Sequence, residues 1–182
     1  MRGLFVGRFQ PFHRGHLELV RGVTASDPSR RLLVVIGSAE RSYTWENPFT
    51  AGERFEMVVR ALDEASVSGV DVVPVPDIDR HALWVRYLEG QLPPFDRVYS
   101  HNALTLLLFQ RAGYATESPP LVDRARLEGV RLREKLSRGQ DIGAWVPPAV
   151  ARYLAEIDAV ARLRALRPAG AAVPTHRRSG EG

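Results

Sequence analysis

Two histidines near the N-terminus have the type and spacing needed to hold a polyphosphate. His13 and His16 follow the segment GRFQPF at residues 7–12. A short apolar run over residues 3–6 precedes that segment, and a helical pattern follows it. Side chains at positions i and i+3 of a helix lie on the same side, with β-carbons about 5–6 Å apart. The unpaired N–H groups and the positive dipole of a helix N-terminus favour an anion between them.

Imidazoles beside a polyphosphate can donate hydrogen bonds to oxygens that gain charge during phosphoryl or nucleotidyl transfer. The alternative interpretation is that His13 only caps the helix and that His16 is a surface residue. The preceding strand, the glycine and the segment Phe-Gln-Pro-Phe favour the phosphate-binding interpretation. We therefore predict that the protein handles a nucleoside triphosphate and transfers a nucleotidyl group.

The strands and helices of the fold must position these two histidines, and the sequence predicts strands and helices in alternation. Residues 32–36 form an uninterrupted apolar run rich in β-branched residues, typical of a strand buried on both faces of a parallel sheet. Residues 50–53 have capping-box spacing and precede an apolar stripe of Phe55, Val58, Val59 and Leu62. Further strands are predicted over 3–6, 71–75, 97–100 and 115–118, and further helices over 15–24, 81–88, 103–111, 130–136 and 147–166. This order predicts an α/β fold, a Rossmann-like doubly wound parallel sheet in a single domain with C-terminal helices.

Length and composition are those of a soluble globular protein with one domain. The chain has 182 residues, of which 45% are hydrophobic and 25% charged. We predict a domain over residues 1–167 and a disordered tail over 168–182, which is rich in Gly, Pro, Ala and Arg. No membrane-spanning run, signal peptide or cysteine is present, which fits a cytoplasmic enzyme without a membrane partner.

The basic residues are almost all arginine. The formal net charge is +4, and Lys135 is the only lysine. No long basic run or alternation of basic and aromatic residues suggests a nucleic-acid surface, so we predict no nucleic-acid partner. A small polyanionic substrate accounts for some of these arginines equally well.

Polar segments follow several of the predicted strands. In an open parallel sheet, ligands bind outside the carboxyl ends of the strands. The segments in question are residues 7–16, 37–43, 76–84 and 100–102. We expect them to converge on one cleft.

These segments resemble a known family, the archaeal-type nicotinamide mononucleotide (NMN) adenylyltransferases. GRFQPFHRGH at residues 7–16 is similar to their signature, which contains the His-x-Gly-His motif of the wider nucleotidyltransferase superfamily. The similarity spans about residues 1–166 and continues through IGSA at 36–39, NPFTAGER at 47–54, DI at 77–78, ALWV at 82–85 and PPFDRVYS at 93–100. NPFTAGER and the tryptophan segment narrow the superfamily to this family.

The resemblance implies a nucleotidyltransferase fold and a reaction. ATP and NMN give NAD and diphosphate with Mg²⁺, which arrives on the phosphates, so no protein metal ligand is expected. The NMN phosphate attacks the α-phosphorus in line and is already an anion at neutral pH, so catalysis reduces to positioning and charge stabilisation. The small-molecule partners are ATP, NMN and NAD. The resemblance also suggests a homo-oligomer, such as a hexamer.

The resemblance also implies roles for individual residues. His13 and His16 bind the ATP phosphates, with His16 closest to the reacting α-phosphate. Trp84 stacks on the nicotinamide ring, where an indole face attracts a flat cation. Backbone groups around Asp77 and Ile78 read the carboxamide. Further contacts to the triphosphate come from Gly7, Arg8, Phe9 and Gln10, and further polar contacts to NMN from Ser38 and Asn102.

One motif departs from the family pattern. In EGVRLR at residues 128–133, Arg133 matches the catalytic arginine expected to hold the β- and γ-phosphates. Glu128 and Val130 stand where the family has hydroxyls, and each lost contact costs ~1–3 kcal/mol. Either Arg131 supplies a replacement charge at the phosphate site, or Glu128 turns outward and serves as a carboxylate at the helix start.

Two single residues also differ within otherwise matching loops. Tyr43 stands where a histidine is common, and His101 stands where a glycine is common. A histidine at that position narrows the cleft or alters which mononucleotide fits. Three alternatives therefore stay open: transfer to nicotinate mononucleotide, transfer to another phosphorylated acceptor, and a degenerate sensor that binds NAD or ATP without turnover.

Overall fold

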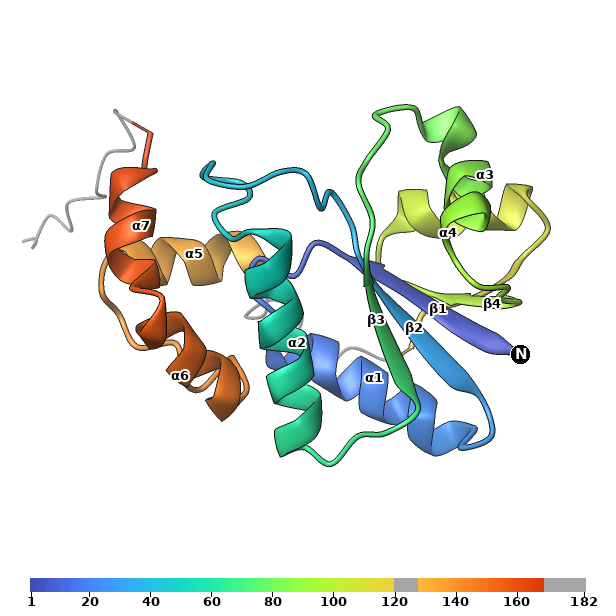
Figure 1. Cartoon of the computed structure of the whole chain (residues 1–182), viewed down its shortest axis with the longest axis horizontal. Coiled ribbons are helices and arrows are strands. Elements are labelled where there is room, and N and C mark those ends of the chain that lie inside the picture. The colour runs from blue at the N-terminus through green and yellow to red at the C-terminus, as the bar shows by residue number, and fades with distance from the viewer. Residues whose placement is uncertain (120–127, 169–182) are drawn as a thin grey trace, which may run out of the picture.

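The strands pair in the order β3-β2-β1-β4-β5, and every pairing is parallel. Figure 1 shows this sheet in the computed structural model, which describes residues 1–119 and 128–168. The strands are β1 (Arg2–Gly7), β2 (Arg31–Ile36), β3 (Val70–Pro74), β4 (Arg97–Tyr99) and β5 (Ala115–Glu117). The helices are α1 (Arg14–Ser26), α2 (Ala51–Glu64), α3 (His81–Gln91), α4 (Ala103–Arg111), α5 (Gly129–Ser137), α6 (Pro148–Glu156) and α7 (Ala159–Ala165). The predicted α/β fold with a parallel sheet is confirmed.

Alternating side chains along the strands divide the apolar core into two clusters. Phe5 and Val34 belong to the first cluster, which also contains apolar residues of α1, α2, α5, α6 and α7. Leu4 and Leu33 point to the opposite face and belong to the second cluster, with residues of α3 and α4. Both faces of β2 are buried, as the sequence predicts.

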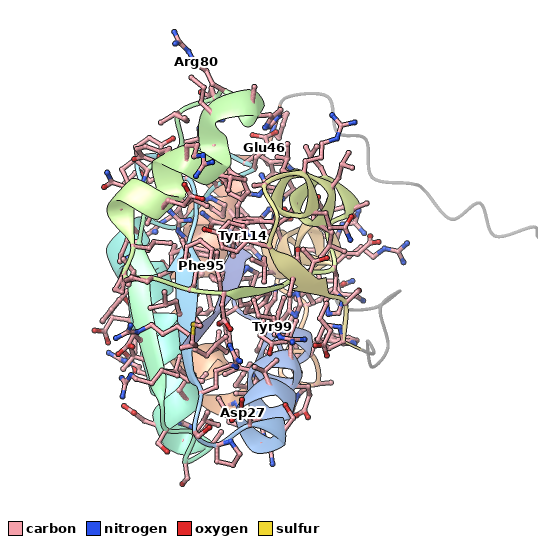
Figure 2. The ribbon with its side chains drawn as sticks, turned by 90° about the vertical axis from the view of Figure 1, so that its right-hand side faces the viewer. Asp27, Glu46, Arg80, Phe95, Tyr99 and Tyr114 are labelled. Atoms are coloured by element: carbon pink, nitrogen blue, oxygen red, sulfur yellow. The ribbon has the colours of Figure 1, made fainter. Side chains whose placement is uncertain are left out.

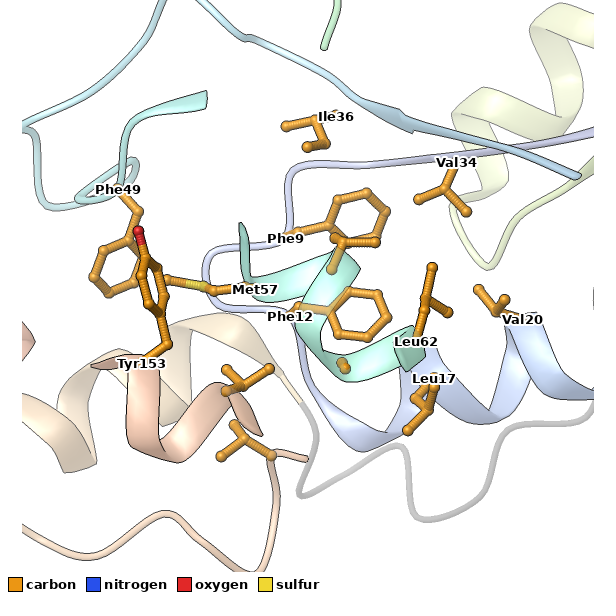
Figure 3. Packing of buried hydrophobic residues seen from close by; sticks show 14 of the residues in the cluster. Phe9, Phe12, Leu17, Val20, Val34, Ile36, Phe49, Met57, Leu62 and Tyr153 are labelled. Carbon is orange, nitrogen blue, oxygen red and sulfur yellow. The ribbon is translucent and has the colours of Figure 1, made fainter. Parts of the chain in front are cut away.

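The first cluster lies under the segment that contains the two histidines. Phe9 and Phe12 lie in it with their rings 5.5 Å apart, edge to face. Figure 3 shows these rings between the sheet and Met57 of α2, with Tyr153 of α6 close to Met57. The turn after β1 is thus fixed by its own aromatic side chains.

The second cluster fills the space between the sheet and helices α3 and α4. Phe95 stacks on Tyr114 with ring centroids 4.9 Å apart, and the two are seen close together in Figure 2. Phe109 of α4 meets Tyr114 and also Trp84 of α3 edge to face. Trp84 therefore packs against the second cluster, on the face of the sheet opposite Phe9 and Phe12.

Helix α2 begins with the predicted capping box. The Thr50 hydroxyl accepts from the Glu53 backbone N–H at 3.1 Å, and the Glu53 carboxylate accepts from the Thr50 N–H at 2.9 Å. The expected apolar stripe needs a correction, because Phe55 and Val59 are only half-buried. The buried positions of this helix are Arg54, Met57, Val58, Ala61 and Leu62.

The single helix predicted over residues 147–166 is two helices. Helix α6 ends at Glu156, and α7 begins at Ala159. Between them Asp158 adopts a left-handed conformation with φ of 47°, and its carboxylate accepts from the Ala161 N–H to cap α7. Aspartate tolerates this conformation and favours helix N-caps, which explains the break.

Helix α7 is attached to the start of α2. Arg162 donates to both carboxylate oxygens of Glu53, at 2.6 and 2.8 Å. Its guanidinium also lies 5.1 Å from the centre of the Tyr43 ring, in the loop between β2 and α2. The last described helix thus supports the loop that follows β2.

The predicted tail over 168–182 lies outside the described residues except for Pro168, and the domain boundary at 167 stays a prediction. Within residues 1–119 and 128–168, every helix is too short or too polar to cross a lipid bilayer.

Candidate active site

Two adjoining cavities open at the carboxyl ends of β1 and β4. Strand β1 pairs with β2 on one side and with β4 on the other, so the strand order reverses at β1. This place in the sheet is a topological switch point. The tryptophan cavity, about 430 Å³, contains Trp84, and the histidine cavity, about 450 Å³, contains His16. Both cavities are lined by Val6, Gly7, Asn102 and Leu104. The four polar segments after the strands therefore do converge on one cleft.

Figure 2 gives the orientation of this cleft. Glu46 and Arg80, from the loops after β2 and β3, lie at one end of the molecule, and Asp27, before β2, lies at the opposite end. The carboxyl ends of the strands thus point toward the end with Glu46 and Arg80.

A tight turn joins β1 to the histidine helix. Phe9 has a left-handed φ of 51° and folds its ring back over Gly7. A β-carbon at Gly7 would lie 2.5 Å from that ring, so only glycine fits. The side chain of Phe9 is buried, and its ring meets the His16 ring edge to face at 4.9 Å. Phe9 therefore offers only backbone atoms to a ligand.

His13 and His16 cap α1 reciprocally. The Nδ1 atom of His13 accepts from the His16 backbone N–H at 3.4 Å, and the Nδ1 atom of His16 accepts from the His13 N–H at 3.2 Å. Their rings stack with centroids 3.4 Å apart. Since a neutral imidazole carries one hydrogen, both rings hold it on Nε2. Each histidine is thus an oriented Nε2–H donor.

Both imidazoles are neutral at physiological pH. Burial, and after it the charge of His101, lowers the pKa of His13 to about 4. Burial, followed by the charges of His13 and His101, holds the pKa of His16 well below 6.5. The pair thus offers a ligand N–H dipoles rather than positive charge. His13 is the helix cap that the alternative interpretation expects, but His16 lines a cavity instead of lying on the surface.

The wall of the tryptophan cavity contains a network around Asp77, in the loop between β3 and α3. The Ser38 hydroxyl donates to one carboxylate oxygen of Asp77 at 3.3 Å. The other oxygen accepts from the backbone N–H of Ile78 at 2.9 Å. Trp84, Ser38 and Asp77 line this cavity, and Ile78 stands next to Asp77 without lining either one. The predicted NMN residues are therefore close to one another.

Asn102 stands where the cavities meet. Its Oδ1 accepts from the Thr105 N–H at 3.1 Å and caps α4, and its own N–H donates to the Ser100 hydroxyl at 3.0 Å. Beside it, His101 lines the histidine cavity and contacts Ser118 Oγ through Nδ1 at 3.3 Å. Three histidines, His13, His16 and His101, thus gather at this end of the sheet.

Arg133 is buried beside the loop that precedes α1. It is 4% exposed, and its Nη1 donates to the Gln10 carbonyl at 2.9 Å. Its Nε is buried and has no hydrogen-bond partner in residues 1–119 and 128–168. Burial, and then the charge of Arg8, lowers the pKa of Arg133 to about 10, so the guanidinium stays protonated. Arg133 lines neither of the two cavities, so it lies behind the wall of the cleft rather than in it.

In the motif at residues 128–133, Glu128, Val130 and Arg131 are exposed and line neither cavity. Glu128 and Arg131 are exposed and form an ion pair at 3.1 Å, and Val130 is 50% exposed. Glu128 has turned outward, as one of the two predicted alternatives requires, and Arg131 is engaged on the surface. Neither lines a cavity.

Two more predicted triphosphate residues differ in what they offer a ligand. The Gln10 side chain is buried and makes two 3.0 Å hydrogen bonds to the backbone of Phe49, so it holds loops together. Arg8 is exposed and lines the tryptophan cavity beside Gly7. Arg8 is therefore free to swing toward a bound phosphate, whereas Gln10 is not.

Sequence reasoning missed Arg54. This residue is fully buried and donates to carbonyl groups of the loops after β1 and β2. The available signal was its spacing: Arg54 lies three and seven residues before the buried Met57 and Ala61, on the inward stripe of α2. A charged residue on such a stripe is expected to be paired inside the protein.

Comparison with known proteins identifies the family of this chain. A Cytidylyltransferase-like family model matches residues 4–108. The chain is 44% identical over 166 residues to a nicotinamide-nucleotide adenylyltransferase of Picrophilus torridus, covering 91% of this chain and 97% of that one. It is 43% identical to the protein of that name from Archaeoglobus fulgidus, covering 90% and 96%.

A solved structure shares the fold. A bifunctional NMN adenylyltransferase/ADP ribose pyrophosphatase from Francisella tularensis, complexed with AMP and a manganese ion, has a TM-score of 0.75 and 19% identity. The match covers 91% of this chain and 51% of that longer one. With the identities above, the chain belongs to the nicotinamide-nucleotide adenylyltransferase family, within the Cytidylyltransferase-like group.

Proposed function

We propose that this protein transfers the adenylyl group of ATP to NMN and releases NAD and diphosphate. The observation that carries the proposal is the pair of adjoining cavities, one with the His16 donor and the other with Trp84. A dinucleotide needs such a double site, because its two halves must be held end to end. The family relatives carry the name of this activity.

The triphosphate lies on the histidine side. The Nε2–H groups of His16 and His13 donate to phosphate oxygens, and the N-terminus of α1 adds its dipole. Arg133 supplies a buried positive charge for the leaving diphosphate. Gly7 permits close approach of the ligand, and Arg8 and the backbone of Phe9 and Gln10 complete the site.

The mononucleotide lies on the tryptophan side. The indole of Trp84 stacks on the cationic nicotinamide ring. Backbone groups at Asp77 and Ile78 read the carboxamide, in a position fixed by the hydrogen bond from Ser38 to Asp77. Asn102 contacts the ligand where the cavities meet.

The reaction needs no protein nucleophile. A phosphate oxygen of NMN attacks the α-phosphorus of ATP, and the bond from that phosphorus to the bridging oxygen breaks, with its electron pair leaving on diphosphate. The NMN phosphate, with a second pKa of about 6, is mostly a dianion at pH 7, so no general base is required. The neutral His16 donor stabilises charge on the α-phosphate oxygens as the transition state forms.

Magnesium enters as part of the substrate MgATP. Among residues 1–119 and 128–168, no group of three or more acidic or histidine side chains could hold a metal ion. In this proposal the phosphates of ATP provide ligands to the ion, and the ion neutralises part of their charge.

The test is an acceptor panel. Purified protein is given ATP and Mg²⁺ with NMN, nicotinate mononucleotide or a sugar phosphate, and diphosphate release and NAD are measured. We expect release with NMN. Release with the sugar phosphate alone would reassign Trp84, and tight NAD binding by calorimetry without any turnover would favour a sensor.

We also propose that the protein is a cytoplasmic homo-oligomer, such as a hexamer. Leu83 of α3 and Leu107 of the adjacent helix α4 are 52% and 45% exposed and would be covered by another copy. Light scattering measures the assembly directly, and a monomer at micromolar concentration would contradict this proposal.

A further inference from the structure

Arg54 is buried completely, yet all of its hydrogen-bond partners are carbonyl groups. Its Nε donates to the Thr50 carbonyl at 3.2 Å. Its Nη1 donates to the carbonyls of Arg8 at 3.0 Å and Gly37 at 2.8 Å. Its Nη2 donates to the carbonyls of Ser38 at 3.0 Å and Arg41 at 3.5 Å. A guanidinium has five N–H donors, so each one has an acceptor.

These carbonyls belong to two separate loops of the cleft. Arg8 belongs to the loop after β1, which leads to the histidine pair. Gly37, Ser38 and Arg41 belong to the loop after β2, and all three line the tryptophan cavity. Arg54 thus joins the loop that leads to the histidine pair to the loop that contains Ser38, and Arg8 of the first loop also lines the tryptophan cavity.

A side chain of different shape cannot make this connection. The guanidinium is planar, and its donors point in fixed directions, whereas lysine has three donors on one nitrogen. Lysine at position 54 would leave at least two of the buried carbonyls without a donor. The loops would then move apart or admit water.

We propose that Arg54 is a positioning residue that fixes the distance between the two substrate loops. This inference rests on the proposed function, in which the loop after β1 contributes to the triphosphate site and the loop after β2 contributes to the mononucleotide site. Such a reaction depends on the relative placement of its two reactants, and a displacement of about 1 Å can cost ~100-fold in rate. Arg54 contacts neither substrate and acts only through the carbonyls that it holds.

Binding measurements separate this role from a general loss of stability. Arg54→Lys and Arg54→Gln are compared with the wild type for affinity toward NMN alone, a non-hydrolysable ATP analogue alone, and NAD. NAD spans both loops, whereas each of the other ligands uses mainly one. We expect NAD affinity to fall by about tenfold or more, and affinity for each single ligand by less than about threefold.

Met57→Ala is the matched control. Met57 is also fully buried on α2, one turn further along, so its loss lowers the melting temperature without removing a carbonyl partner. We expect this variant to keep the wild-type ratio of NAD to NMN affinity.

Kinetics give a second measurement. The kcat of the wild type is measured in parallel, and the Arg54 variants should lose kcat with little change in the KM for ATP or for NMN.

The outcomes distinguish a failure of the proposed function from a failure of the positioning role of Arg54. A wild type that makes no NAD overturns the proposed function. An active wild type with Arg54 variants that keep the NAD to NMN affinity ratio overturns the positioning role, and so does a Met57→Ala variant that changes the ratio equally. If Arg54→Gln does not fold, Arg54→Lys, which retains the charge, decides the matter.

Discussion

The rings of His13 and His16 lie 3.4 Å apart, and each ring nitrogen Nδ1 accepts the backbone N–H of the other residue. This reciprocal capping explains how two histidines can be phosphate ligands without being cations. The backbone fixes both tautomers, so the hydrogen of each ring is on Nε2 before any ligand arrives, and His16 of the pair lines the histidine cavity. The donors are preorganised, which is the property that transition-state stabilisation requires.

Replacing His16 with alanine is expected to lower kcat by about 10²–10³-fold, because one oriented donor to the α-phosphate is lost. ATP should still bind, since Arg133 and the α1 N-terminus remain. Steady-state kinetics and calorimetry with an ATP analogue measure the two effects. Unchanged turnover in a folded variant would remove His16 from the reaction.

The lowered pKa of His13 predicts a stability that depends on pH. The folded pKa of about 4 lies below the unfolded value of 6.5, so the unfolded chain binds the proton more readily. The neutral His13 ring adds about 3 kcal/mol to the free energy of unfolding above pH 6.5. This contribution is lost as the pH falls toward 4. Urea unfolding at pH 7.5 and pH 5 measures the loss.

His13→Asn is the control for that measurement. Asparagine is a good helix N-cap but does not titrate, so its variant should lose less stability between the two pH values. Carboxylates elsewhere titrate equally in both proteins and cancel in the comparison. An identical loss in the wild type and in the variant would contradict the prediction.

Trp84→Ala is expected to raise the KM for NMN by about tenfold or more with a smaller change in kcat, because stacking on the nicotinamide ring is lost. Trp84→Phe should recover part of the affinity. The KM for ATP should change little. If the KM for NMN stays at its wild-type value, the side chain serves only to pack against Phe109.

Two arginines on α5 provide a matched pair. Arg133→Ala should lower kcat/KM for ATP by about 10²-fold or more, because a buried charge beside the diphosphate is lost. Arg131→Ala, at an exposed ion pair with Glu128, should change it by less than about twofold. Equal losses in the two variants would show that the surface charge matters as much as the buried one.

Much of this architecture could be predicted from the chain alone because the deciding signals are local. The apolar run of β2, the capping box at Thr50 and the spacing of His13 and His16 each report on a few neighbouring residues. Parallel topology then brings the strand ends together. The local signals locate the strands, and the parallel topology gathers the polar segments that follow them, so convergence of these segments on one cleft could be predicted.

Other features depend on contacts between distant residues and were not predictable in that way. The spacing of Arg54 marks it as an inward residue of α2, but its partners in the loops after β1 and β2, 13 to 46 positions away, follow only from the structure. The break at Asp158 interrupts an apolar pattern that continues through it, and only the left-handed backbone reveals it. The outward turn of Glu128 likewise depends on its ion pair with Arg131.

The sheet separates the packing environments of the two ligand halves. His16 touches the aromatic rings of the first cluster, whereas Trp84 rests on Phe109 in the second. The sheet stands between these clusters, so the two rings are supported by different side chains. Under the proposed function, substitutions around Phe109 would change the acceptor preference, by selection or by engineering, while the aromatic packing around His16 is retained.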